Sequence, residues 1–191
     1  SALQESMDQR MQRIVSVLED AIKDGRINVS QDQRRIIVRV EEQGSFPSGS
    51  AQITWEFEGL LLEMAEVLAN MPGTLTVEGH TDDVPIHTER FYSNWDLSAA
   101  RAAAVANVLL ARDGIDPTRL EVKGLADTQP RVPNDSPEHR AKNRRVEIII
   151  DLSGPLQEEE IQLRELLKTA PPGDTGDGLN VDTHTSGDLH W

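Results

Sequence analysis

Three groups of polar residues in this sequence have the types and spacing to do chemistry. The first is His80-Thr81-Asp82-Asp83, which His87 follows after a short gap. Histidine and carboxylate side chains this close together can ligate a metal, but their spacing matches neither an H-E-x-x-H helix nor a closed zinc pattern. We therefore expect no metal and no cofactor. A metal-dependent hydrolase that uses His80, Asp82 and His87 stays open as an alternative.

The second group centres on Arg101, within an alanine-rich stretch that the hydrophobic spacing predicts to be a helix over residues 96–113. If Ser98 or Asp96 caps this helix, Arg101 lies in the first turn, where the helix dipole disfavours a positive charge. Arg101 also lies on the side of the helix that must face a sheet. It therefore needs an anion, which is either a structural carboxylate at Asp82 or Asp83 or an anionic group of a ligand.

The third group is Asn143-Arg144-Arg145, at the entrance to the last predicted strand. Successive side chains of a strand point to opposite faces of the sheet. One of the two arginines can therefore point toward the same cleft as Arg101, and we expect the other to be solvated at the surface.

The elements that must position these groups follow from the hydrophobic spacing and the turn residues. After a hairpin, helices and strands alternate to the end of the predicted domain. The hairpin covers 27–29 and 35–41, the helices 55–71, 96–113 and 137–143, and the strands 75–77, 120–122 and 146–151. Alternation of this kind predicts a sheet covered by helices, with at least one parallel pair of strands joined through a helix.

Both ends of the chain differ from this alternating part. The hydrophobic spacing predicts an amphipathic helix over residues 3–24, with an apolar stripe that runs from Met7 to Ala21. The stripe packs either on its own domain or on a second copy of the chain in a coiled coil, and both alternatives stay open. Residues 157–168 are compatible with one more helix, and the composition from Ala170 onward predicts disorder.

Composition excludes several classes of protein. The 191 residues carry 19 Lys and Arg against 33 Asp and Glu, a net charge of −14 that repels nucleic acid and anionic lipid. The absence of cysteine excludes disulfides and thiolate metal sites. No apolar run approaches the roughly 20 residues that span a bilayer, so we expect any membrane anchor to precede Ser1.

A run of motifs resembles the OmpA-like peptidoglycan-binding domains over about residues 46–151. Residues 94–109 follow the pattern N-x-x-L-S-x-x-R-A-x-x-V-x-x-x-L, with Val77-Glu78-Gly79-His80-Thr81-Asp82 before it and Asn143-Arg144-Arg145-Val146-Glu147 after it. Within this family, Phe46-Pro47-Ser48-Gly49-Ser50-Ala51 and Asp82-Asp83-Val84-Pro85-Ile86 are similar to the corresponding segments of the MotB/PomB class of flagellar stator proteins.

The resemblance implies an α+β fold, a two-layer sandwich of a mixed β-sheet with helices packed on one face and a βαβαβ core. It implies a non-catalytic domain that binds the stem peptide of peptidoglycan at diaminopimelate. Asp82 would take the ammonium of the ligand and Arg101 its carboxylate. The remaining cleft residues would be Asn94, Leu97, Asn143 and Arg144.

The resemblance also implies an organisation and a setting. Residues 1–26 would be a linker and dimerisation helix, 27–153 the peptidoglycan-binding domain, and 154–191 an acidic and largely disordered tail. The protein would be a periplasmic homodimer, tethered to the inner membrane by a preceding transmembrane helix that contacts a MotA/PomA-type partner. An outer-membrane OmpA/Pal-like envelope tether and a metal-dependent cell-wall hydrolase are the alternatives.

Overall fold

The computed structural model describes residues 6–153, 162 and 165–168. The chain divides into two units, Ser1–Gln157 and Glu158–Trp191, and the sheet lies in the first. The described residues of the second unit are helical, and they fall within the predicted helix 157–168. The rest of that helix and nearly all of the predicted tail 154–191 lie outside the described residues.

The first unit is built on a five-stranded sheet with the order β1-β2-β5-β3-β4. The strands are β1 (Ile27–Asp32), β2 (Arg35–Glu41), β3 (Thr74–His80), β4 (Leu120–Gly124) and β5 (Arg145–Asp151). β3 and β4 are parallel and joined through a helix, whereas the other neighbouring strands are antiparallel. The predicted mixed sheet with a helical crossover is confirmed.

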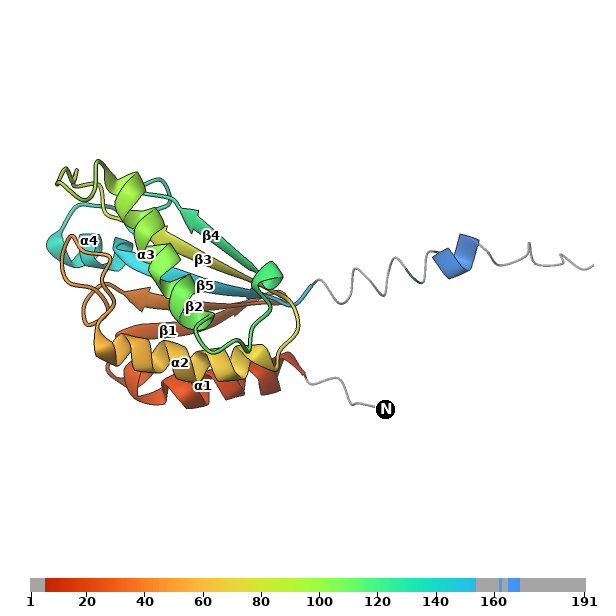
Figure 1. Cartoon of the computed structure of the whole chain (residues 1–191). Helices are drawn as coiled ribbons and strands as arrows, with labels where there is room; N and C mark the ends of the chain where they lie inside the picture. The colour runs from red at the N-terminus through yellow and green to blue at the C-terminus, as the bar shows by residue number, and fades with distance from the viewer. Residues whose placement is uncertain (1–5, 154–161, 163–164, 169–191) are drawn as a thin grey trace, which may run out of the picture. The chain divides into compact units, whose positions relative to one another are not determined.

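Helices cover one face of this sheet (Figure 1). They are α1 (Met7–Lys23), α2 (Trp55–Ala69) and α3 (Asn94–Leu109), while the short helices η1 (Pro117–Arg119) and α4 (Pro137–Asn143) precede β4 and β5. Alternate residues of the central strands, such as Val38 and Ile148, are fully buried against the helices. The other face of the sheet carries charged side chains.

The apolar stripe of α1 packs on its own domain. Ile14, Leu18 and Ala21 are at most 1% exposed and belong to the same hydrophobic core as α2 and the sheet. The first of the two open alternatives is therefore what the structure shows for Ile14, Leu18 and Ala21. These side chains supply core contacts, whereas Met7 and Met11, at the start of the stripe, are only partly buried.

The start of α3 lies unusually close to the ends of β3 and β4. A Cβ atom on Gly79 would come within 2.0 Å of the carbonyl oxygen of Ser98, and one on Gly124 within 2.6 Å of Ala99. The hydroxyl of Ser98 also accepts a hydrogen bond of 3.1 Å from the backbone N–H of Ala126. Glycine at both strand ends thus lets the helix sit directly on them, which fixes the position of its first two turns.

α3 begins earlier than the sequence predicts. Ser93 caps it, and a reciprocal capping box joins Ser93 and Asp96. Arg101 therefore lies beyond the first turn, and the prediction that the helix dipole destabilises its charge is wrong.

Candidate functional site

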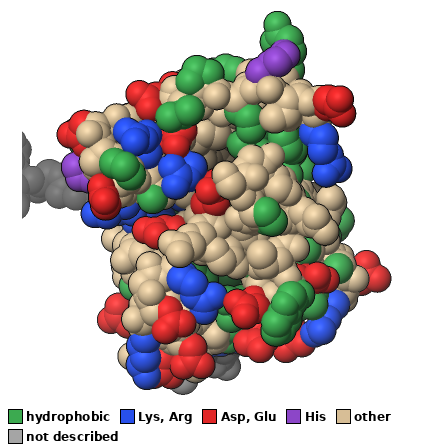
Figure 2. All heavy atoms as spheres, turned by 90° about the vertical axis from the view of Figure 1, so that its left-hand side faces the viewer, with side chains coloured by type: hydrophobic (Ala, Val, Ile, Leu, Met, Phe, Trp, Pro, Cys, Tyr) green, Lys and Arg blue, Asp and Glu red, His purple; other side chains and the backbone are tan. Residues whose placement is uncertain are grey.

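A cleft of about 450 Å³ opens at the end of the domain where α3 and α4 meet the loop after β2. Its charged lining residues are Glu42, Asp82, Arg101, Arg140 and Arg144, and its less polar wall includes Val84, Pro85, Ile86, Leu97 and Pro137. Figure 2 looks onto the end of the molecule that lies at the left in Figure 1, where basic and acidic side chains gather close together on one part of the surface. This volume is in the usual range for a small-molecule site.

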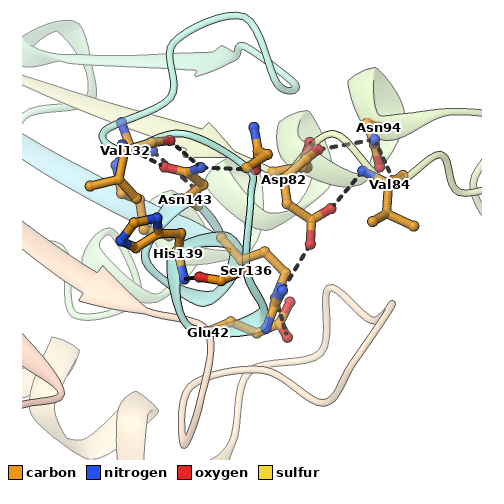
Figure 3. A network of polar contacts seen from close by, with 12 residues as sticks. Glu42, Asp82, Val84, Asn94, Val132, Ser136, His139 and Asn143 are labelled. Atoms are coloured by element: carbon orange, nitrogen blue, oxygen red, sulfur yellow. Dashed lines mark hydrogen bonds and ion pairs between the residues drawn. The ribbon is translucent and has the colours of Figure 1, made fainter.

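Four of the charged side chains form a chain of alternating sign. Arg144 donates from Nη1 to Oδ2 of Asp82 at 2.8 Å and from Nε to Oε1 of Glu42 at 3.2 Å. The other carboxylate oxygen of Glu42 accepts from Nη1 of Arg101 at 2.7 Å. The steps from Asp82 to Glu42 can be followed in Figure 3. The order Asp82, Arg144, Glu42, Arg101 places negative and positive groups side by side along the cleft.

Arg101 is the innermost member of this chain. Its side chain is 3% exposed, and besides Glu42 it donates to the carbonyl oxygens of Ser50 at 2.7 Å and Pro47 at 3.2 Å. Its guanidinium also lies 4.9 Å from the ring centre of Phe46. Three of its five N–H groups are therefore used within the domain, where they hold the loop before α2 against α3.

The loop after β3 presents Asp82 to the cleft. Oδ1 of Asp82 accepts a hydrogen bond of 3.0 Å from the backbone N–H of Val84. Asn94, the first residue of α3, donates to the carbonyl oxygen of Val84 at 3.0 Å. These contacts fix the carboxylate of Asp82 with one oxygen toward its own loop and the other toward Arg144 (Figure 3).

The pKa of Arg144 shows which effect prevails in the cleft. Burial alone would lower the pKa of this guanidinium, but the hydrogen bond to Asp82 and the charge of Glu42 act in the opposite direction and raise it above its usual value. The carboxylates thus outweigh the desolvation of Arg144, as expected for opposite charges in direct contact.

Comparison with known proteins identifies the family of this chain. The OmpA family model matches residues 45–144, which is more than half of the chain. The chain belongs to the OmpA family.

This OmpA-family domain is similar to proteins of motility and of wall anchoring. It is 29% identical over 151 residues to Motility protein B of Bacillus subtilis, covering 78% of this chain and 58% of that protein. Among solved structures, the cell wall anchor of the T6SS from Pseudomonas aeruginosa is 42% identical with a TM-score of 0.68, over 74% of this chain and 98% of the other. The periplasmic domain of Helicobacter pylori MotB is 29% identical with a TM-score of 0.61, over 76% and 92%.

The chain thus spans less than two thirds of the length of Motility protein B. Among the described residues of the OmpA-family chain, no helix has the length and the apolar character that crossing a membrane requires.

The structure brings most of the residues predicted for the site together. Asp82, Asn94, Leu97, Arg101 and Arg144 all line the cleft. Arg101, however, pairs with the carboxylate of Glu42. The prediction that a structural ion pair would join it to Asp82 or Asp83 is therefore wrong. The sequence analysis did not identify Glu42, because this residue follows β2 in a polar segment without any motif. Only the tertiary structure shows that it lies in the cleft.

Asn143 does not line the cleft. Its side chain is fully buried, and its oxygen accepts hydrogen bonds from the backbone N–H groups of Arg131 at 2.8 Å and Val132 at 3.1 Å. Its amide nitrogen donates to the carbonyl of Val132 at 2.8 Å and to Asn134 at 2.9 Å. Asn143 therefore holds the loop before α4 in place, as Figure 3 shows, and has no free group for a ligand.

The expectation that the second arginine of the pair 144–145 is solvated is wrong. Arg145 is 6% exposed and lies on the sheet face opposite the helices. It donates to Glu147 at 3.1 Å and to the carbonyl oxygens of Asn143 and Gln129, both at 3.0 Å. The alternation itself is observed, but backbone carbonyls and a carboxylate take the place of water.

The residues of the hydrolase alternative are not brought together. His80 lies beside Glu78 at 3.2 Å and Glu147 at 3.8 Å, whereas Asp82 lines the cleft and His87 contacts the backbone of Tyr92. Among the described residues, the group with metal-ligating geometry is Glu78, His80 and Glu147. Glu147 is also held by Arg39 and Arg145, so its charge is already balanced.

This buried group predicts a pH dependence of stability. Burial alone would raise the pKa of Glu147, but Arg145 and Arg39 outweigh it and lower the pKa. A carboxylate with a lowered pKa stabilises the fold above its unfolded pKa, and this contribution is lost as the pH falls through the folded value. We expect Glu147→Gln to destabilise the domain by about 2 kcal/mol at pH 7, because it leaves the guanidinium of Arg145 poorly paired.

Urea denaturation across pH measures this effect. The difference in unfolding free energy between wild type and Glu147→Gln should shrink as the pH falls from the ordinary glutamate pKa of about 4.3 toward the lowered pKa of folded Glu147, because the unfolded chain binds the proton first. Glu121→Gln on β4, where the side chain is exposed, is the control and should change little at either pH. A difference that is constant with pH would show that Glu147 does not act through its charge.

Proposed function

We propose that this domain binds peptidoglycan in the cleft of Asp82, Glu42, Arg144 and Arg101, and thereby anchors a flagellar motor stator complex to the cell wall. The chain of alternating charges carries the proposal. A zwitterionic group, such as the free end of diaminopimelate in a stem peptide, offers one ammonium and one carboxylate at a fixed separation. An acid and a guanidinium held side by side match it with charge-assisted hydrogen bonds.

The geometry supports an exchange of ion pairs upon binding. Asp82 is 8% exposed and already contacts Arg144, so the ligand's ammonium replaces Arg144 at Asp82. The ligand's carboxylate then takes the guanidinium that is released, together with the two N–H groups of Arg101 that the domain does not use. Asn94 and Leu97 form the wall beside Asp82. The exchange leaves no buried charge unpaired, which keeps its cost low.

The similarity to Motility protein B and to MotB periplasmic domains supports the stator role. In this proposal the domain is periplasmic, belongs to a homodimer, and is tethered to the inner membrane by a preceding helix that contacts a MotA/PomA-type partner. These features concern a longer protein than the chain described here.

A second candidate is the wall anchor of a secretion machine. The chain is 42% identical to the T6SS cell wall anchor from Pseudomonas aeruginosa, against 29% for the MotB domain of Helicobacter pylori. Both candidates share the same cleft and the same wall ligand, and they differ in the machine that is anchored. Transplanting the domain into a MotB-deficient and into a T6SS-anchor-deficient strain would separate them by the function that it restores.

The binding role itself is tested with purified sacculi. The domain should sediment with sacculi and release no soluble muropeptide from them, because we propose a non-catalytic role. Elemental analysis of the purified protein accompanies the digest. Stoichiometric metal together with cleaved product would favour the hydrolase alternative and overturn the proposal.

A further inference from the structure

We propose that Arg140 binds a second carboxylate of the ligand, distinct from the carboxylate of the zwitterionic end. This inference rests on the proposed function, because it assigns a further contact in the same cleft. Arg140 belongs to none of the motifs that the sequence analysis singled out. It lies in the last turn of α4, one helical turn before Arg144.

The charges in the cleft do not balance. Two carboxylates, Glu42 and Asp82, and three guanidinium groups, Arg101, Arg140 and Arg144, line it. The chain of ion pairs uses both carboxylates to hold Arg101 and Arg144. Arg140 is therefore the surplus positive charge, and it stands out in a protein whose net charge is −14.

The side chain of Arg140 has no partner among the described residues. Its backbone N–H and carbonyl take part in the α4 turn, but no described residue pairs with or accepts from its guanidinium. The residue is half-buried and contributes to the cleft wall. All five of its N–H donors are thus free for a ligand, whereas Arg101 donates three of its own to groups within the domain.

Its position is also electrostatically unfavourable without an anion. Arg140 and Arg144 are four residues apart and line the same cleft. Arg144 is the extended C-cap residue of α4, so the two positive charges repel each other across the cleft and not along a helix face. An anion bound beside Arg140 removes this repulsion, so the site gains more from a bound carboxylate than an isolated surface arginine would.

The chemistry of a stem peptide provides such an anion. Besides the zwitterionic end of diaminopimelate, the glutamate that precedes it carries a free α-carboxylate, since it is linked to diaminopimelate through its γ-carboxyl. A planar guanidinium can hold this group with two parallel hydrogen bonds. With the zwitterion held by Asp82 and Arg101, Arg140 binds the neighbouring glutamate when its α-carboxylate is free and loses this charged contact when that group is amidated.

Calorimetry with two soluble tripeptides tests this. Both are L-alanyl-γ-D-glutamyl-diaminopimelate, one with a free glutamate α-carboxylate and one with that group amidated. Wild type should bind the free form about 10-fold more tightly, the lower end of what a charged hydrogen bond contributes. Arg140→Gln should lose this preference by weakening the free form alone. Lys142→Gln, an equal charge change on the exposed side of α4, should keep it.

The outcomes separate this inference from the proposed function. Equal affinity of wild type for the two peptides, or an equal weakening of both by Arg140→Gln, would overturn the role of Arg140 while leaving peptidoglycan binding in place. Failure of wild type to bind either peptide or sacculi would instead overturn the proposed function, and this inference with it.

Discussion

Replacing Arg101 by leucine is expected to destabilise the domain by about 3–5 kcal/mol and to abolish sacculus binding, because it breaks a buried ion pair from one side. The variant leaves the Glu42 side chain, which is 14% exposed, with Arg144 as its one remaining ion-pair partner in the part of the chain that the structure describes. It also frees the carbonyl oxygens of Pro47 and Ser50, so the loop before α2 loses its attachment to α3. Urea denaturation and co-sedimentation with sacculi measure the two losses.

The chain contains a matched control for this variant. Arg112 also pairs with a glutamate, Glu66, at 2.9 Å, but the two side chains are 57% and 69% exposed. Arg112→Leu should therefore cost less than about 1 kcal/mol and leave binding unchanged. The double variant Arg101→Leu with Glu42→Gln should recover part of the stability without recovering binding. An Arg101→Leu protein with the wild-type denaturation midpoint would show that the buried pair does not hold this end of the domain.

Asp82→Asn is expected to weaken the affinity for sacculi by about 10- to 150-fold while keeping the fold, since a charge-assisted contact contributes roughly 1.5–3 kcal/mol. Asparagine keeps an oxygen that can accept the hydrogen bond from the Val84 N–H, so the loop after β3 retains its shape. Arg144 keeps its contact with Glu42. What is lost is the negative charge that would receive the ligand's ammonium.

The neighbouring Asp83 provides the control for Asp82. It is exposed and does not line the cleft, so Asp83→Asn makes the same change in net charge without touching the network. Co-sedimentation at two salt concentrations compares the variants. If both lose affinity equally, the effect of Asp82 is a long-range charge effect and the clamp is refuted.

The sequence was sufficient to predict where the strands and helices lie, because they depend on local hydrophobic spacing, whereas the strand order depends on contacts between distant segments. The predicted helix 137–143 matches α4, and the predicted strand 120–122 lies within β4. The start of α3 was predicted less well, because Ser93 and Asp96 cap it through a reciprocal contact that competes with the other possible cap residues.

The sequence predicted only part of the site. The motif residues Asp82 and Arg101 lie in the cleft, but the role of each depends on contacts with residues far away in the chain. Glu42 is 59 residues from Arg101 and 102 from Arg144, and no pattern of spacing connects them. Asn143 fits the family pattern equally well, yet its side chain is hydrogen-bonded to the backbone of the loop before α4. Spacing identifies the type of residue at a site, while burial and partners decide which of its groups are free.

Peptidoglycan binding in the cleft is tested most directly by mapping where a stem peptide touches the domain. In an NMR titration of the nitrogen-15-labelled protein with the diaminopimelate tripeptide, we expect the largest amide shift changes in 81–84, 94–101 and 140–144, around the cleft. The outer face of the sheet, around Arg39, Glu78 and Glu147, should stay unchanged. Saturable shifts on that face with none at the cleft, or no shifts at all from a peptide whose parent sacculi bind, would contradict the claim that the cleft holds peptidoglycan.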